Sequence, residues 1–395
     1  MTALQPGLRK LLTAQIPADF ADWLDVVAIS ALLAFVWQVD TYVFALLAVA
    51  MGLPYLIIGP LAGALVDRVD TRRVLIFANL GRGFATIAFF LAGEWPALLA
   101  LIALRSVVDT FYSPANQSAI QALSDPATRI RANAISHGIN QASKIVAPSV
   151  GGVLLIWFTP QTVFLANACA SFLAVALLLR LSKLPAAPRD ADSPGLLASL
   201  KSGPALLRDS AVLRAVLLMM AAGYFAMFFY DNLIAPLTRD LGFSQTHLGL
   251  LLAAVGAGGV ICAAVMSRLR STPRPFLLIT CGALIGGSTV VAVGLAEVTG
   301  FPLALATYLL AFFVLGVTTA LMVVPIRTVI QNNTDSSSIG QITALSEAAN
   351  TLALLTAPFI GAWLATATTI GAAFVLGGAV MLGLGLRAFT LRNIS

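Results

Sequence analysis

The chain has 395 residues, of which 59 % are hydrophobic and 10 % are charged, and its mean hydropathy is +0.93. Soluble domains carry about 25 % charged residues, so this composition excludes a soluble enzyme. It also excludes a soluble nucleic-acid-binding protein, although the net charge is +6. Apolar runs of about 20 residues recur from end to end, each long enough to cross a bilayer. The sequence therefore predicts an integral membrane protein.

Twelve apolar runs predict an all-α membrane fold with twelve transmembrane helices. The first run contains Asp19, Asp22 and Asp25 and lacks a small-residue cleavage site, so we expect a retained helix rather than a signal peptide. The expected helices are 16–37, 42–66, 74–91, 95–113, 134–157, 162–181, 211–233, 247–266, 275–295, 301–324, 342–363 and 371–389.

The basic residues lie mainly on one predicted side of the membrane. With the N-terminus inside, about 19 of the 23 lysines and arginines fall in inner segments, and the outer loops hold Arg239. We therefore expect a multi-pass protein of a bacterial inner membrane with both termini in the cytoplasm.

The longest predicted loop, 182–210, contains Pro185, Pro188 and Pro194 and separates six helices from six more. It predicts an N-terminal bundle (1–181), a cytoplasmic linker (182–210) and a C-terminal bundle (211–395). Several residues recur 210 positions later: Asn140 as Asn350, Ala147-Pro148 as Ala357-Pro358, and Gly151 as Gly361. Such a six-helix period predicts two bundles related by a pseudo-twofold axis along the membrane normal.

Motifs for catalysis and cofactor binding are absent from the sequence. There is no Gly-x-x-x-x-Gly-Lys-Ser/Thr loop for nucleotide phosphates, and no Gly-x-Ser-x-Gly or His-Glu-x-x-His motif. The three cysteines lie in apolar runs without metal-ligand spacing. We therefore expect no enzyme activity, no cofactor, no metal and no disulfide, and an ion or substrate gradient as the energy source.

The loop between the second and third predicted helices contains Gly63, Asp67, Arg68, Arg72 and Arg73. With this spacing it is similar to the signature loop of the major facilitator superfamily. The resemblance implies that this loop acts as a conformational switch by docking the eleventh helix in one of two access states. Asp70 departs from the family's usual glycine, so a differently capped turn is expected. The alternative interpretation is an ordinary cytoplasmic basic loop.

The fourth predicted helix contains Leu101-Ile-Ala-Leu-Arg105, which resembles the family's membrane-embedded arginine motif. Asp109 follows one turn later on the same face. Arginine stays protonated even in a membrane, so Arg105 would control proton binding at a nearby carboxylate. The alternative is a static ion pair. Arg82, in the third helix, is expected to have a structural role.

The fifth helix carries Ala147-Pro148-Ser-Val-Gly151-Gly152, similar to the superfamily's antiporter motif with Ala147 in place of glycine. The proline removes a backbone hydrogen bond and the glycines permit close packing, so this helix can bend against a neighbour. The resemblance implies an exporter, whereas the alternative is a role in packing alone.

The segment Ala21-Asp22-Trp23 resembles the branch that contains macrolide-efflux and enterobactin-exporting members. Asp22 is the leading proton-carrier candidate, and Asp25 lies on the same helix face. An N-terminal cap or interfacial role for Asp22 is the alternative. The other proton-coupling candidates are Arg105, Asp109, Asp231 and Glu347.

Two groups of residues are candidates for substrate binding. A polar stripe on the fifth helix would be costly facing lipid and is expected to face the bundle interior. The alternative is that His137 lies in the cytoplasmic interface region and has no role. An aromatic and thioether face on the seventh helix suits amphipathic or cationic ligands, although packing is an alternative. The candidates are His137, Gln141, Lys144, Tyr224, Met227, Phe228 and Asn350, the last from the eleventh helix.

Together, the resemblance implies a monomeric, proton-coupled exporter of amphipathic small molecules of the drug or siderophore type, working by alternating access. One alternative within transport is an uptake symporter or a lysophospholipid-type transporter of the same superfamily. Alternatives from other classes are a non-transporting receptor or channel and an intramembrane enzyme.

Overall fold

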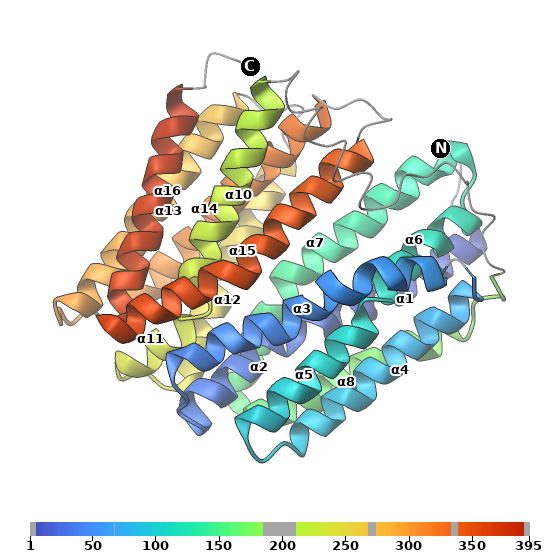
Figure 1. Cartoon of the computed structure of the whole chain (residues 1–395), viewed down its shortest axis with the longest axis horizontal. Coiled ribbons are helices and arrows are strands. Elements are labelled where there is room, and N and C mark those ends of the chain that lie inside the picture. Colours follow the sequence, from blue (N-terminus) through green and yellow to red (C-terminus); the bar gives the residue numbers. More distant parts are fainter. Residues whose placement is uncertain (1–4, 67, 185–210, 268–273, 333–338, 391–395) are drawn as a thin grey trace. The chain divides into compact units, whose positions relative to one another are not determined.

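A computed structural model describes residues 5–66, 68–184, 211–267, 274–332 and 339–390. Every regular element in these residues is helical (Figure 1). Among them, eleven helices are long and apolar enough to cross a membrane. The expected all-α membrane fold is confirmed.

The chain forms two compact units. The first comprises residues 1–39 and 49–193, and the second comprises residues 40–48 and 194–395. The division at 193/194 falls inside the predicted linker, most of which lies outside the described residues. The short segment 40–48, at the start of one long helix, groups with the second unit.

The helices of the first unit are coloured blue to green in Figure 1. In chain order they are α1 (Pro6–Leu24), α2 (Val26–Ala31), η1 (Leu32–Val36), α3 (Thr41–Val66), α4 (Thr71–Phe90), α5 (Trp95–Asp109), α6 (Tyr112–Leu123), α7 (Pro126–Trp157) and α8 (Pro160–Leu178). Helix α8 packs against both α1 and α4, and α7 also packs against α1. Helix α1 therefore lies among the other helices of its unit.

The helices of the second unit are α10 (Ala211–Asp231), α11 (Ile234–Asp240), α12 (Gln245–Ser267), α13 (Pro275–Val298), α14 (Leu305–Asn332), α15 (Ile339–Ala367) and α16 (Ile370–Thr390). Helix α13 packs along α16 and along α14, and α10 packs along α15. Most of this unit therefore consists of long helices in extended side-by-side contact.

The first predicted helix is the one that differs most from expectation. The apolar run 16–37 is part of a helical segment that starts ten residues earlier, at Pro6, and breaks at Asp25 before a π-helical turn over Leu32–Val36. Its charged residues and this break keep it out of the eleven long apolar helices. This broken segment corresponds to the one expected helix that is not among those eleven.

Several helices extend beyond the apolar runs that predicted them. The run 95–113 continues through α6 to Leu123 after a short break, and α7 begins at Pro126 instead of at 134. Asp125 and Thr128 form a reciprocal capping box at that start. The length of an apolar run reflects the thickness of the bilayer. The ends of a helix are determined instead by capping and helix-breaking residues.

The repeated Pro-x-x-Gly segments make matching contacts within their own units. A side-chain carbon built on Gly151 of α7 would lie 2.6 Å from the Leu24 carbonyl oxygen of α1. One built on Gly361 of α15 would lie 2.0 Å from the Phe229 carbonyl oxygen of α10. In each unit, a glycine one turn after the helix proline admits a neighbouring backbone.

Candidate functional site

Five charged side chains meet inside the first unit, and we call them the charge cluster. Helix α1 supplies Asp22, α4 supplies Arg82, and α5 supplies Arg105 and Asp109, while Asp25 lies at the break between α1 and α2. All except Asp22 are buried, and the Asp22 side chain is 27 % exposed.

Arg105 contacts all three carboxylates of the cluster. Its nitrogens lie 2.5 Å from Asp25 Oδ2, 3.3 Å from Asp22 Oδ1 and 3.3 Å from Asp109 Oδ2. The Asp109 contact is the expected pairing one helical turn apart. The other two contacts connect α5 with Asp22 and Asp25. Arg105 can reach both aspartates because they lie on one face of their helical segment.

Arg82 is the member whose placement sequence reasoning missed. Its side chain is 1 % exposed, and its Nε donates a 2.8 Å hydrogen bond to Asp109 while its Nη2 lies 3.6 Å from Asp22. It also donates to the Ala18 carbonyl at 2.8 Å and lies over the Tyr112 ring. The presence of an arginine within an apolar helix indicated a buried partner. Its partners could not be identified from the sequence, because they lie on other helices.

The break in α1 positions the two aspartates. Two carbonyls near the end of α1 accept side-chain donors: Ala18 from Arg82, and Ala21 from Asn167 Nδ2 at 2.7 Å. Side chains that insert into a helix's hydrogen-bond ladder are a recognised cause of kinks. Asp25 sits at the resulting C-cap, where its carboxylate meets Arg105.

The charge cluster contains one more carboxylate than guanidinium. With all groups ionised, Asp22, Asp25 and Asp109 outnumber the two arginines by one negative charge. Asp25 Oδ1 is buried without a hydrogen-bond partner among the described residues. Uncompensated buried charge is costly, so the cluster can accept one positive charge.

The expected polar stripe on α7 has a mixed environment. His137 and Lys144 are exposed and Gln141 is half-buried. The Lys144 ammonium lies 5.5 Å from the centre of the Trp23 ring on α1, a cation–π contact. The stripe therefore contacts α1 at Trp23, the residue that follows Asp22 of the charge cluster.

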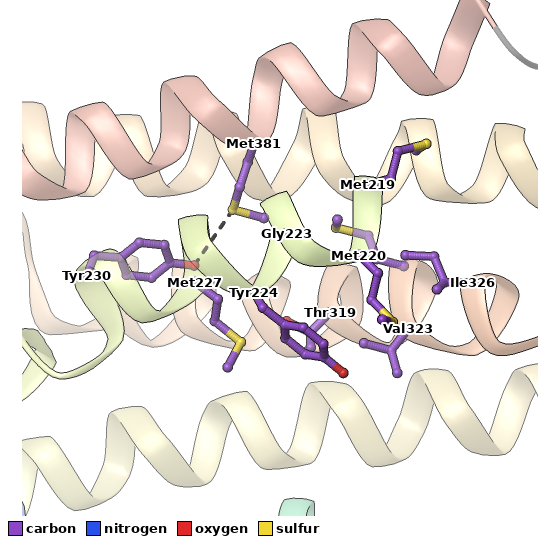
Figure 2. Close-up of a pocket in the computed structure, with 11 residues that line it drawn as sticks. Met219, Met220, Gly223, Tyr224, Met227, Tyr230, Thr319, Val323, Ile326 and Met381 are labelled. Atoms are coloured by element: carbon purple, nitrogen blue, oxygen red, sulfur yellow. Dashed lines mark hydrogen bonds between the residues drawn. The ribbon is translucent and has the colours of Figure 1, made fainter. Parts of the chain in front are cut away.

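A cavity of about 70 Å³ lies within the second unit, between α10, α14 and α16 (Figure 2). Five of the chain's eight methionines line it: Met219, Met220, Met227, Met322 and Met381. Tyr224 and Tyr230 line it as well, and the Tyr230 hydroxyl lies 3.8 Å from the Met381 sulfur. The lining is soft, apolar and flexible, which suits ligands of variable shape.

The predicted aromatic face of the seventh helix divides between this cavity and its surroundings. Tyr224 and Met227 line the cavity, whereas Phe228 stacks on Tyr224 with ring centres 6.2 Å apart. Asp231, at the end of α10, is exposed and is not part of the lining. The carboxylate expected beside this wall therefore does not face the cavity.

The signature loop lies between α3 and α4, and the residues at its end form hydrogen bonds with the end of α8 and the residues that follow it. Asp70 caps α4 by accepting from the Arg72 amide, and it also accepts from the Leu184 amide. The Arg72 guanidinium donates to the Leu178 and Leu179 carbonyls. Arg68 and Arg73 are exposed. The departure at Asp70 thus supplies a helix cap.

The remaining predicted site residues have fewer described contacts. Asp67 and the side chain of Glu347 lie outside the described residues, and Gly63 is described by its backbone alone. Asn350 is half-buried on α15, Ala147 is fully buried on α7, and Pro148 and Gly152 follow it on that helix. Within the described residues, no group of three His, Cys, Asp or Glu side chains is placed to hold a metal.

Comparison with known proteins gives matches along almost the whole chain. The model of the Major Facilitator Superfamily matches residues 11–288 and 216–394. The chain is 28 % identical over 392 residues to the uncharacterized MFS-type transporter YfiS of Bacillus subtilis (strain 168), covering 97 % of this chain and 92 % of that protein.

Two further relatives are efflux proteins by name. Macrolide efflux protein A of Enterococcus faecalis is 27 % identical over 262 residues, covering 63 % of this chain and 79 % of the relative. The enterobactin exporter EntS of Shigella flexneri is 27 % identical over 294 residues, covering 73 % and 68 %. A solved POT family transporter in complex with 5-aminolevulinic acid has a similar fold, with a TM-score of 0.74 at 13 % identity over 98 % of this chain and 96 % of that one.

Proposed function

The chain belongs to the Major Facilitator Superfamily, and we propose that it is a proton-coupled exporter of amphipathic small molecules. The observation that carries this proposal is the charge cluster with its one excess carboxylate. The coupling ion is a proton bound by the cluster, and the substrate is an organic molecule that occupies the methionine-lined cavity.

Asp22 exchanges the proton with solvent, because it is the member of the cluster with substantial exposure. When Asp22 is ionised, it attracts both guanidiniums. When it is protonated, Arg105 and Arg82 keep their contacts with Asp25 and Asp109, and the cluster is neutral. Each proton transfer thereby changes the forces between α1, α4 and α5, which supports a link between protonation and conformation.

The methionine-lined cavity supports a substrate of amphipathic character. Unbranched thioether side chains adapt to different ligand shapes, and tyrosine rings attract organic cations. Substrate enters from the cytoplasmic side, and the protein works by alternating access. The proteins named for macrolide efflux and enterobactin export support the outward direction.

The membrane potential is large enough to drive this exchange. Moving one charge through 100 mV is worth about 2.3 kcal/mol, which corresponds to roughly fifty-fold accumulation. We place the protein in a bacterial inner membrane as a monomer with both termini in the cytoplasm.

Dye transport into inverted membrane vesicles tests the proposal. With an inward-acidic gradient, the wild type should accumulate Hoechst dye or ethidium, and a protonophore should abolish that accumulation. Asp22→Asn should reduce the gradient-driven component about tenfold or more, because a neutral amide cannot carry the proton. Asp240→Asn, at an exposed residue paired with Arg239 outside the cluster, is the matched control.

Accumulation that persists in the presence of protonophore would overturn proton coupling. Full activity of Asp22→Asn would overturn the assignment of Asp22. If neither dye is transported in the outward direction while either is taken up by right-side-out vesicles, the direction is uptake and the export proposal is wrong.

A leucine at Gly223 tests the cavity as the substrate site. A side-chain carbon built at Gly223 has its nearest neighbour, Met322, at 4.0 Å, so the larger side chain can grow into the cavity. Gly223→Leu should lower dye export about tenfold through lost binding space, while thermal stability changes little. Gly383→Leu on α16, where nothing lies within 4 Å, is the control. Unchanged export by Gly223→Leu would place the substrate elsewhere.

A further inference from the structure

A buried acidic residue outside the charge cluster lies one turn before Asp22 on α1. Asp19 is 2 % exposed, and no lysine or arginine nitrogen is recorded within ion-pair distance of it in the described part of the chain. Its hydrogen-bond donors are neutral groups, two amides and the hydroxyl of Tyr112. Gln15 Nε2 donates to Asp19 Oδ2 at 2.8 Å, and Asn140 Nδ2 donates to the same oxygen at 3.4 Å.

Two buried amide oxygens near Asp19 have no hydrogen-bond partner among the described residues. They are Gln15 Oε1 and Asn116 Oδ1, and their side chains are 3 % and 6 % exposed. The nitrogen of each amide is bound to Ser136 of α7: Gln15 Nε2 to its carbonyl at 3.0 Å, and Asn116 Nδ2 to its hydroxyl at 3.4 Å. Gln15 of α1 and Asn116 of α6 therefore both hydrogen-bond to Ser136 of α7, and each keeps a buried amide oxygen available to a ligand.

The orientation of Gln15 is set by its two acceptors, because only the amide nitrogen can donate to both Asp19 and Ser136. In a planar amide, oxygen and nitrogen lie about 2.3 Å apart. Gln15 Oε1 is consequently within about 5 Å of the Asp19 carboxylate. A hard cation with ligands at about 2.4 Å can bridge two oxygens that lie up to about 4.8 Å apart, which covers nearly all of that range.

We propose that Asp19, Gln15 and Asn116, the last two hydrogen-bonded to Ser136, form a site for a monovalent hard cation, Na⁺. Carboxylate and carbonyl oxygens are the ligands of hard cations, and divalent ions are bound more strongly where several carboxylates converge. A single carboxylate balances a single positive charge. The site connects α1, α6 and α7 beside the charge cluster, whose Asp22 and Arg82 interact electrostatically with Asp19. It takes a different ion at different residues, so it does not rest on the proposed function.

Binding of ²²Na⁺ to the purified full-length protein in detergent tests this site. The wild type should bind ²²Na⁺ saturably, with displacement by NaCl but not by choline chloride. Asp19→Asn should weaken binding about tenfold or more, as expected when a metal ligand is lost. Asn116→Ala should weaken it by a smaller factor, because the carboxylate remains.

Thermal stability supplies a second measurement. NaCl should raise the Tm of the wild type by about 2 °C or more over choline chloride at equal ionic strength, because a ligand of the native state stabilises it. Asp22→Asn should keep both Na⁺ effects, since Asp22 belongs to the charge cluster. This variant also separates the two proposals, because loss of proton coupling in Asp22→Asn leaves the Na⁺ site intact.

Absence of saturable ²²Na⁺ binding by the wild type would overturn the proposal. Retention of Na⁺ binding in both Asp19→Asn and Asn116→Ala would overturn the assignment of these residues. Loss of Na⁺ binding in Asp22→Asn with retention in Asp19→Asn would move the cation into the charge cluster and refute the site at Asp19. If Asp19→Asn fails to fold, Asn116→Ala decides the matter.

Discussion

The two units have the same kind of helical architecture but bury different chemistry. The first unit buries five charged residues, Asp19, Asp25, Arg82, Arg105 and Asp109, together with many amide and hydroxyl groups. Among the described residues of the second unit, the buried polar side chains are three threonines: Thr238, Thr280 and Thr318. Side-chain ion pairs and hydrogen bonds connect many helices of the first unit, whereas close backbone contact at glycines predominates in the second.

Glycines produce that close contact. A side-chain carbon built on Gly316 of α14 would lie 1.9 Å from the Val255 carbonyl of α12, and one built on Gly258 would lie 2.1 Å from the Phe313 carbonyl. In a membrane, helices associate through such small-residue packing or through polar contacts. The comparison teaches that a repeated fold can keep its architecture while the described parts of its two copies bury different side chains.

Arg82→Ala should have the largest effect on stability. It would leave Asp109 buried without its closest partner, and removing one member of a buried ion pair costs about 3–5 kcal/mol. Scanning fluorimetry in detergent should show a large decrease in Tm. Arg180→Ala, at an exposed residue beyond the end of α8, is the control, with a change within about 0.5 kcal/mol. Equal stability of the two variants would contradict the contrast between the units.

Gly316→Ala should give the next largest effect, in the unit whose described residues include no buried charged side chain. The added methyl group would force α12 and α14 apart, and overpacking of this kind costs about 1–3 kcal/mol. Gly383→Ala, where nothing lies within 4 Å, should be neutral or slightly stabilising because alanine favours helix. A thermal melt of both proteins would reveal these opposite signs, and the same sign for both would refute backbone contact as the source of stability.

Arg72→Ala should have the smallest effect of the three. It removes donors to the Leu178 and Leu179 carbonyls at the end of α8, a loss of about 1 kcal/mol. Arg73 is the adjacent control, because its side chain is 73 % exposed and its 3.8 Å pair with Asp70 contributes little. Limited proteolysis near the end of α8 should be faster in Arg72→Ala than in Arg73→Ala, and equal rates would argue against this anchoring.

Sequence reasoning was strongest where partners share one helix. Arg105 and Asp109 are four residues apart, so their contact was predictable from helical spacing alone. The shared face of Asp22 and Asp25 was predictable in the same way. The apolar runs also predicted the fold class, because bilayer thickness determines their length.

Contacts between helices distant in the chain were beyond such reasoning. Arg82 meets Asp109 because α4 and α5 pack side by side, and Asp19 meets Asn140 across α1 and α7. A single sequence carries no spacing signal for either pair. The break at Asp25 was equally invisible, since it depends on side chains of α4 and α8 that reach the α1 carbonyls.

The concentration of methionines around one cavity gives the protein its own spectroscopic reporters. With five of eight methionines in the lining, ¹³C-methyl labelling of methionine places most of its NMR signals at this one location. Met266, at the end of α12, supplies a reference outside the cavity within the same unit. A ligand that enters the cavity would shift the lining signals together and leave that of Met266 in place, so occupancy is readable without modifying the chain.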